Sequence, residues 1–315
     1  MQRNDFKLIV IFAIVGFLIG PKIFASQKSA PNEKELATQP AAIAATSSKP
    51  DPFTGMSLTA KSAFVWDIAS QRVLYAKNAQ SPQTLASITK MMTAVVALES
   101  TTADGEVTIR SDDLAVEGST DLRKDERWSL KDLLALTLVE SSNHGASAIA
   151  ASVGAALDSN KNRTRDEQRD DFVAAMNAKS KQIGLNSFAF TSPSGLDAGS
   201  TPGGSGSAHD VAKLFEYILR HHSSLLQYTA QPIVTVTSKQ HIAHRVANTN
   251  EIAAATPGII GGKTGYTDMA GGNLAIIVDI GIQQPVVIVA LGSTREQRFT
   301  DVQALLAAAK LAMNN

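Results

Sequence analysis

Cysteine is missing from all 315 residues of the chain. Disulfide bonds, thiol catalysis and cysteine metal sites are therefore excluded, although the redox compartment stays open. An excess of either charge is missing too, because 29 lysine and arginine residues balance 29 aspartate and glutamate residues. A near-neutral chain has no general attraction for nucleic acid or for an anionic membrane surface. The composition thus predicts neither kind of electrostatic partner.

The N-terminal apolar run is shorter than a membrane span. Residues 8–20 carry no charge, Arg3 and Lys7 precede them, and Pro21 closes the run. A full span needs about 20 residues, whereas the core of a signal peptide needs about 7–15. We therefore predict that residues 1–25 are a signal peptide or an N-terminal membrane anchor. Either would export the rest of the chain to a periplasmic or extracytoplasmic location, with membrane contact only through this segment.

The following stretch has almost no large apolar side chains. Residues 26–55 are rich in Ser, Ala, Pro, Gln, Thr and Lys. Such a segment cannot bury enough surface to offset the entropy that it loses on ordering. We predict a flexible linker over 26–55 and one folded domain over 56–315.

Apolar periodicity in the domain predicts strands near both of its ends and helices between them. The expected strands are 63–68, 72–75, 106–109, 258–266, 273–279 and 286–291, and the expected helices are 86–100, 130–139, 145–156, 172–183, 211–219 and 299–309. The run 158–171 is so polar that we expect a solvated loop. This order predicts an α+β fold, in which N- and C-terminal strands form an antiparallel sheet flanked by helices. A mostly helical subdomain is inserted, and the cleft beside it is the expected site.

A serine and a lysine lie at the start of the first expected helix. Ser87 and Lys90 are three residues apart, and Ser87 is the only serine with a lysine at that spacing. Side chains three residues apart are neighbours on a helix. A serine hydroxyl needs a neighbouring base to become a nucleophile. We therefore interpret Ser87 as a candidate nucleophile and Lys90 as its base.

Two further clusters are weak when each is taken singly. Ser141-Ser142-Asn143 stands at a helix break, where such triplets commonly form a cap or a turn. Gly262-Lys263-Thr264-Gly265 stands on an expected strand, where glycine often marks the close approach of a ligand or another backbone. Together with Ser87 and Lys90, their order matches the motif set of penicillin-binding proteins and serine β-lactamases.

The sequence resembles the low-molecular-mass penicillin-binding proteins, which are serine D-alanyl-D-alanine carboxypeptidases and endopeptidases. The resemblance runs from about Ser57 to the C-terminal helix. Besides the three motifs, the segments that resemble the family are 86–94, 176–179, 194–197, 248–250 and 263–271. The resemblance implies a β-lactamase/transpeptidase-like fold. It also implies a carboxypeptidase that removes the terminal D-alanine from peptidoglycan stem pentapeptides, with no cofactor and no metal.

The resemblance also implies a role for each motif residue. Ser87 would form an acyl-enzyme, with Lys90 as the base. Ser141 would pass a proton to the leaving D-alanine, and Asn143 would hydrogen-bond Lys90 or the substrate amide. The backbone N–H groups of Ser87 and Tyr266 would form the oxyanion hole.

By the same resemblance, the late strand would bind the substrate. Lys263 and Thr264 would hold its terminal carboxylate, and Gly265 would leave room for the peptide along the strand. Arg298 matches a family arginine near that carboxylate, but it fits a surface helix residue equally well. β-Lactams, which mimic the D-Ala-D-Ala terminus, are expected to acylate Ser87 as covalent inhibitors.

Three features depart from the family pattern. His144 follows the Ser-x-Asn motif where the family usually has an acidic residue, and we expect a loop histidine without a task. His209 stands where the family tends to have arginine, and we assign it no role. Many family carboxypeptidases have a C-terminal β-rich domain, whereas we expect residues 56–315 to form the peptidase domain alone.

Other functions stay open. A D,D-endopeptidase that cuts peptidoglycan cross-links would use the same machinery. A class A β-lactamase needs an additional glutamate for deacylation, and Glu167, Glu216 and Glu251 lack the loop context for that role. A non-catalytic penicillin-binding sensor would not need a nucleophile. A zinc peptidase built on His221-His222 and His241-x-x-His244 would lack a metalloprotease context.

Overall fold

The computed structural model describes residues 50–157 and 162–314. The predicted signal peptide or anchor, and the predicted linker as far as residue 49, lie outside the described residues. At the end of the predicted linker, Phe53 is buried in a turn and stacks on Tyr75, with 5.2 Å between the ring centroids. Burial of an aromatic ring stabilises the folded state, so the packed part of the chain already includes Phe53.

A five-stranded antiparallel sheet combines strands from both ends of the domain. Its order is β10 (Ile259–Thr267), β11 (Gly271–Asp279), β12 (Pro285–Ser293), β1 (Ser62–Asp67) and β2 (Arg72–Lys77). The first strand therefore pairs with the last one, and Phe64 lies opposite Val289. This arrangement confirms the predicted α+β fold and its sheet of N- and C-terminal strands.

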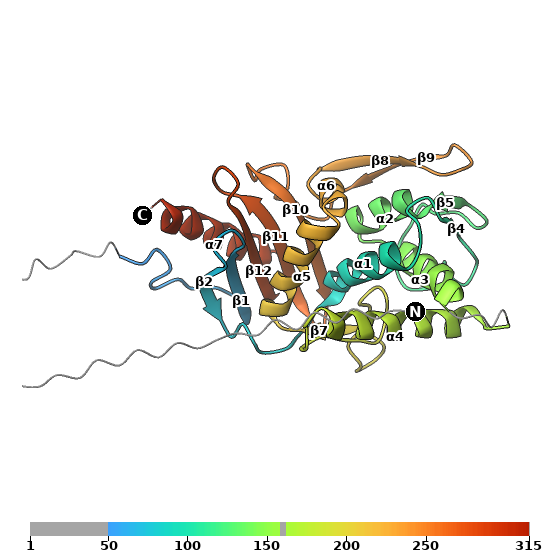
Figure 1. Cartoon of the computed structure of the whole chain (residues 1–315), viewed down its shortest axis with the longest axis horizontal. Coiled ribbons are helices and arrows are strands. Elements are labelled where there is room, and N and C mark those ends of the chain that lie inside the picture. The colour runs from blue at the N-terminus through green and yellow to red at the C-terminus, as the bar shows by residue number, and fades with distance from the viewer. Residues whose placement is uncertain (1–49, 158–161, 315) are drawn as a thin grey trace, which may run out of the picture. The chain divides into compact units, whose positions relative to one another are not determined.

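Two helices cover the opposite faces of this sheet (Figure 1). Helix α5 (Ala208–His221) packs on the face that carries Phe64 and Trp66. Helix α7 (Gln297–Met313) packs on the face that carries Val65. Because alternate residues of a strand point to opposite faces, β1 contributes to both cores, and all six of its residues are buried.

A mostly helical part is inserted between β2 and β10, as predicted. Besides α5, its helices are η1 (a 3₁₀ helix, Ala86–Thr89), α1 (Lys90–Ser100), α2 (Leu130–Val139), α3 (Asn143–Leu157), α4 (Arg165–Gln182) and α6 (Ser224–Thr229). Its short strands are β3 (Gln83–Thr84), β4 (Glu106–Thr108), β5 (Arg127–Ser129), β6 (Ala189–Phe190) and β7 (Gly204–Gly206). Within the described ranges, no helix has both the length and the apolar character that a membrane crossing requires.

The predicted solvated loop over 158–171 is wrong from Arg165 onward, because α4 begins there. Thr164 provides a reciprocal capping box at the helix start. Arg165 and Arg169 reach the fully buried carboxylate of Asp113 at 2.5 and 2.9 Å. Capping and ion pairs, rather than an apolar stripe, hold the first half of this helix, so its sequence carries no helical periodicity.

A hairpin of β8 (Ile233–Thr237) and β9 (Ala243–Ala247) was not predicted from the sequence. It packs against α2 and extends beyond it (Figure 1). Its buried side chains are Val236, Val246 and His244, and His244 Nε2 lies 2.7 Å from Glu126 Oε1. A buried polar pair of this kind satisfies both groups and fixes where the hairpin lies.

Candidate active site

The serine and the lysine of the first motif meet where η1 joins α1. Lys90 Nζ lies 2.7 Å from Ser87 Oγ. The lysine side chain is fully buried, and its amine also donates to Asn143 Oδ1 and to the Ser194 carbonyl, both at 2.8 Å. Three acceptors therefore hold the amine against the hydroxyl, which is the geometry that base activation of a serine requires.

The backbone beside Ser87 adopts an uncommon conformation. Ala86 has a φ of +48°, in the left-handed region that few residues other than glycine occupy. Gly195 packs so closely that a Cβ at this position would lie 1.9 Å from the Ala86 carbonyl oxygen. The segment around Gly195 thus supports η1 and also brings the Ser194 carbonyl to Lys90. Backbone strain held in place by tight packing is typical of functional sites.

The second motif forms the break between α2 and α3. Ser141 has a φ of +66°, and its Oγ accepts a hydrogen bond from Lys263 Nζ at 2.9 Å. Asn143 accepts from Lys90 through Oδ1 and donates through Nδ2 to the Glu117 carbonyl at 2.9 Å. This break therefore contacts both buried lysines, one through Ser141 and the other through Asn143.

The third motif brings β10 against η1 at Gly265. A Cβ at this position would lie 2.7 Å from the Leu85 carbonyl oxygen and 3.1 Å from the backbone nitrogen of Ser87. Glycine is required here because a side chain would push the two backbones apart. Tyr266 is the next residue of the strand, so the N–H groups of Ser87 and Tyr266 belong to backbones in close contact.

Thr264 and Arg298 also contact their neighbours at this strand. Thr264 Oγ1 lies 2.6 Å from Thr249 Oγ1. Arg298, near the start of α7, donates from Nη1 to the Gly265 carbonyl at 2.8 Å. Its side chain is buried, with 6% exposed, so the interpretation as a surface helix residue is wrong. The guanidinium holds the backbone of the strand between Thr264 and Tyr266.

Burial changes the proton affinity of both lysines. Burial, together with the positive charge of Arg298, lowers the pKa of Lys263 to about 7. Burial, together with the charge of Lys263, lowers the pKa of Lys90 well below its ordinary value. A neutral amine at Lys90 can accept a proton from Ser87, while the remaining positive charge beside it attracts an anion.

An open cleft of about 680 Å³ begins beside Asn143 and Tyr266. Its other lining residues are Glu117, Gly118, Leu196, Asp197, Gly199, Thr267, Asp268, Met269 and Arg295. Asn143 connects this cleft to Lys90, and Tyr266 connects it to β10. A peptide in the cleft would therefore reach the nucleophile along the strand.

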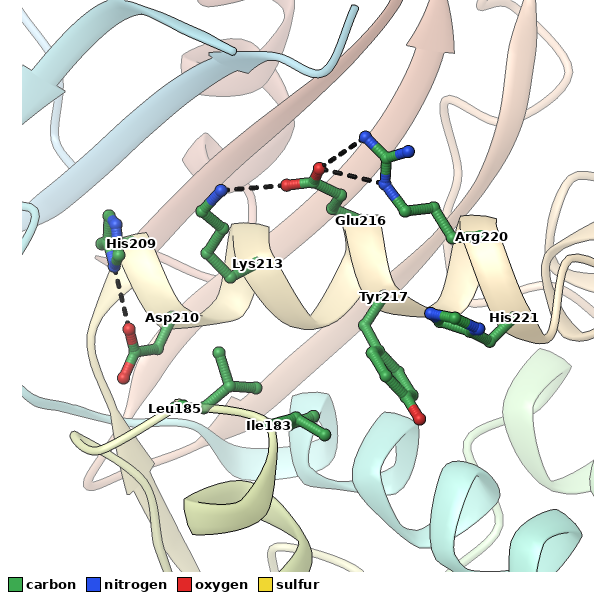
Figure 2. Close-up of a pocket in the computed structure, with 10 residues that line it drawn as sticks. Ile183, Leu185, His209, Asp210, Lys213, Glu216, Tyr217, Arg220 and His221 are labelled. Atoms are coloured by element: carbon green, nitrogen blue, oxygen red, sulfur yellow. Dashed lines mark hydrogen bonds and ion pairs between the residues drawn. The ribbon is translucent and has the colours of Figure 1, made fainter. Parts of the chain in front are cut away.

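A smaller pocket of about 320 Å³ lies between α5 and the turn that follows α4 (Figure 2). Lys213 and Arg220 both contact Glu216 there, at 3.0 and 2.8 Å, and His209 lies 2.8 Å from Asp210. These charges neutralise one another within the pocket wall. His209, which has no role assigned from the sequence, thus belongs to this wall and does not line the open cleft.

Some supporting contacts come from distant segments and were missed in the sequence. Asn273, buried in β11, donates to the carbonyls of Thr84 and Leu85 at 2.9 and 3.0 Å and accepts from the Gly292 N–H at 2.8 Å. It ties the sheet to the segment that enters η1. The sequence does contain a signal for this role: Asn273 lies within a run of apolar strand residues, and a buried amide requires hydrogen-bond partners.

Two of the histidines, His144 and His244, are buried. His144 is not a loop residue, because it lies buried in the first turn of α3, where burial lowers its pKa. His222 lies 2.9 Å from Glu99, and His244 is paired with Glu126. Among the residues described, no three His, Cys, Asp or Glu side chains are grouped so that they could hold a metal ion.

Comparison with known proteins gives consistent results. The model of the D-alanyl-D-alanine carboxypeptidase family, peptidase S11, matches residues 44–295. A D-alanyl-D-alanine carboxypeptidase of Mycobacterium tuberculosis, DacB2, is 31% identical over 209 residues, which cover 65% of this chain and 66% of that enzyme. This chain therefore spans just under two thirds of that relative. A D-alanyl-D-alanine endopeptidase of Pseudomonas aeruginosa is 29% identical over 292 residues, which cover 84% of this chain and 87% of that enzyme.

A solved structure shares the fold. Ampicillin-bound penicillin-binding protein D2 of Listeria monocytogenes superimposes with a TM-score of 0.67 and 28% sequence identity. The superposition covers 80% of this chain and 98% of that one. The predicted β-lactamase/transpeptidase-like architecture is thereby confirmed.

Proposed function

Because the chain belongs to the D-alanyl-D-alanine carboxypeptidase family of serine peptidases, we propose that it hydrolyses the D-Ala-D-Ala bond of peptidoglycan stem pentapeptides through an acyl-enzyme on Ser87. The observation that carries this proposal is the contact of a buried lysine with that serine, 2.7 Å between Lys90 Nζ and Ser87 Oγ. A purely structural lysine would be expected near a carboxylate, whereas the contacts of Lys90 are a hydroxyl and two neutral oxygens.

In the proposed acylation, Ser87 Oγ attacks the carbonyl carbon of the penultimate D-alanine. Lys90, as a neutral amine, takes the hydroxyl proton. The N–H groups of Ser87 and Tyr266 stabilise the negative charge that develops on the carbonyl oxygen, an interaction typically worth about 10²–10³ in rate for each donor. The close approach of β10 to η1 at Gly265 supports this pairing of donors.

In the collapse of the intermediate, the bond to the terminal D-alanine breaks and its nitrogen needs a proton. We assign this step to Ser141, which relays to that nitrogen the proton that Lys90 took from Ser87, and which accepts a hydrogen bond from Lys263 at 2.9 Å. Lys263 and Thr264 bind the terminal carboxylate, and Arg298 adds positive charge through its contact with the strand at Gly265. Water then hydrolyses the ester on Ser87 and restores the free enzyme.

β-Lactams are the proposed covalent inhibitors. The Listeria relative is described in an ampicillin-bound form. A strained lactam in the same cleft would acylate Ser87 by the same route as the peptide, because the ring amide takes the place of the scissile bond.

The decisive experiment is covalent labelling by a fluorescent penicillin together with D-alanine release from a pentapeptide. We expect wild-type protein to be labelled and active. Ser87→Ala abolishes both signals, whereas Ser111→Ala, which removes an exposed serine outside the motifs, retains both. Labelling that persists in Ser87→Ala would overturn the assignment of the nucleophile, and unlabelled, inactive wild-type protein would favour a non-catalytic module.

A D,D-endopeptidase is the second candidate. The Pseudomonas endopeptidase matches over 84% of this chain and 87% of its own length. The same machinery would cut the bond between the penultimate D-alanine and the side-chain amine of a neighbouring stem. Mass spectrometry of a pentapeptide and of a cross-linked dimer separates the two. Loss of D-alanine from the pentapeptide supports carboxypeptidase activity, and cleavage of the dimer alone supports the endopeptidase.

A class A β-lactamase has less support, because two of the three glutamates between Asn143 and Lys263 have other contacts. Glu167 caps α4, and Glu216 accepts from Trp66 at 3.0 Å. Glu251 is exposed. Slow rather than rapid turnover of penicillin is therefore expected.

Export of the chain through the segment 1–25 also stays a prediction.

A further inference from the structure

The open cleft extends beyond the residues of the three motifs. From Asn143 and Tyr266 it continues past Thr267 to Asp268 and Arg295. This outer cleft, beside Thr267, Asp268 and Arg295, does not take part in the proposed bond cleavage. Its volume of about 680 Å³ exceeds what a single alanine side chain fills, so the cleft has room for a further part of the substrate.

The direction of β10 indicates which part of the substrate lies there, an argument that rests on the proposed function. The terminal carboxylate is assigned to Lys263 and Thr264, and the scissile carbonyl to the N–H of Tyr266. The acyl part of the peptide must then leave toward Thr267 and Asp268, since an extended chain advances about 3.3 Å per residue along a strand. The residue that precedes D-Ala-D-Ala therefore enters the outer cleft.

One wall of the outer cleft presents a cation and an anion in fixed positions. The Arg295 guanidinium lies over the Tyr266 ring, 4.9 Å from its centroid. The Tyr266 hydroxyl donates to Asp268 Oδ1 at 3.1 Å. The ring thus orders both charges, and the side chains of Arg295 and Asp268 are exposed.

The other wall contributes a second exposed carboxylate. Glu117 lines the cleft, and its backbone carbonyl is held by Asn143 Nδ2 at 2.9 Å. Asp197 also lines the cleft, but its carboxylate accepts from the Thr267 hydroxyl at 2.6 Å and from the Gly203 N–H at 2.9 Å. The groups with capacity for a ligand are therefore the carboxylates of Glu117 and Asp268 and the guanidinium of Arg295.

We propose that the outer cleft selects stem peptides whose third residue has a side chain ending in both an ammonium and a carboxylate, as in 2,6-diaminopimelate. The ammonium pairs with Glu117 or Asp268, and the carboxylate pairs with Arg295. Lysine satisfies only the acidic groups, because it lacks the carboxylate. A side chain without charge satisfies neither.

The test compares pentapeptides that differ only in the third residue: diaminopimelate, lysine and Nε-acetyl-lysine. We expect kcat/KM to fall in that order, by about fivefold at each step, the effect of one partly exposed ion pair. Arg295→Gln brings the ratio of diaminopimelate to lysine close to 1, whereas Arg245→Gln, an exposed arginine on β9, keeps it. Glu117→Gln reduces the ratio of lysine to acetyl-lysine.

A second carboxylate of the stem, on the γ-linked D-glutamate, is the alternative partner of Arg295. Peptides with D-isoglutamine at that position lack it. If the preference for diaminopimelate persists with D-isoglutamine, the third residue is its source. If the preference is lost, the assignment to the third residue is overturned.

The two proposals fail in different ways. Penicillin labelling with equal turnover of all three peptides overturns the selective cleft alone, as does an unchanged ratio in Arg295→Gln. Absence of both labelling and turnover overturns the proposed function and the selective cleft with it. If only cross-linked dimers are cleaved, the same ratios are measured on dimers with the corresponding third residues.

Discussion

The two walls of the candidate active site each contain one buried lysine, but they hold it by different means. On the helical wall, Lys90 is surrounded by three acceptors, one of them the nearby Ser87 hydroxyl. On the strand wall, Lys263 donates to Ser141 and to the carbonyl of Thr264, and burial together with the positive charge of Arg298 lowers its pKa. The helical wall therefore stabilises an amine that can take a proton, and the strand wall gathers positive charge.

The difference shows how one site can contain a base and an anion-binding group of the same residue type. Burial and a neighbouring positive charge lower the pKa of each lysine. Lys90 has Lys263 as its charged neighbour, and Lys263 has Arg298. The proposed roles require Lys90 to act as a neutral base while Lys263 binds an anion. Substitutions on either wall test this difference between the two lysines.

The largest expected effect is on the helical wall. Lys90→Met removes the proposed base while it keeps an unbranched side chain in the buried space. We expect the rate of acylation by penicillin to fall about 10²–10⁴-fold, the usual contribution of a general base. Stopped-flow acylation measures it, with Lys131→Met, on the exposed surface of α2, as the control. A decrease of less than tenfold would show that Lys90 is not the base.

The second largest effect is expected when β10, on the strand wall, is pushed away from η1, on the helical wall. Gly265→Ala places a Cβ 2.7 Å from the Leu85 carbonyl oxygen, so β10 must move away from η1. We expect acylation to slow by about 10²–10³-fold, as for the loss of one oxyanion donor. Gly184→Ala, at an open position with a φ of +78°, costs about 1–2 kcal/mol of stability but leaves acylation unchanged. Acylation at the wild-type rate in Gly265→Ala would contradict the proposed oxyanion hole.

A smaller effect is expected from the influence of the Lys263 charge, on the strand wall, on the pKa of Lys90, on the helical wall. The acylation rate rises with pH as Lys90 loses its proton, because only the neutral amine is a base. Lys263→Met removes a positive charge that lowers the pKa of Lys90. The rising limb of the pH–rate profile is therefore expected to shift to higher pH in this variant. A shift to lower pH would reverse the proposed electrostatic order.

The smallest effect is on stability. Lys263 has a pKa of about 7 in the folded protein and about 10.4 in an unfolded chain, so the unfolded state binds more protons between these values. Lys263 therefore contributes an increase in the stability of the wild type from pH 7 to pH 10, and Lys263→Met lacks this contribution, while buried Lys90 still adds its own. Melting temperatures at the two pH values measure the difference. A gap between the two proteins that does not change with pH would contradict the lowered pKa.

Local patterns predicted much of this molecule. The helix over 130–139 was predicted with its Ser129 cap, which accepts from the Asp132 N–H at 3.1 Å. The spacing of Ser87 and Lys90 predicted their contact, because neighbours on one turn need no information from the rest of the chain. The three late strands were predicted by their apolar runs. In each of these cases the residues that form the structure are also adjacent in the sequence.

The missed features depend on contacts between distant segments. The start of α4 is held by arginines that reach Asp113, more than 50 residues away. The Ser194 carbonyl meets Lys90 across 104 residues. The periodicity of the sequence does not encode such pairs. The position of Arg298 near a helix start fitted a surface residue and a residue of the site equally well, and only its burial in the structure decides between the two.

The position of β1 in the sheet has a consequence for biosynthesis. This strand lies between β2, its neighbour in the chain, and β12, which the ribosome adds more than 200 residues later. A growing chain therefore carries Ser87 and Lys90 long before β10 exists to face them. Such late pairing makes folding slow, and it delays activity until β10 and β12 have been synthesised.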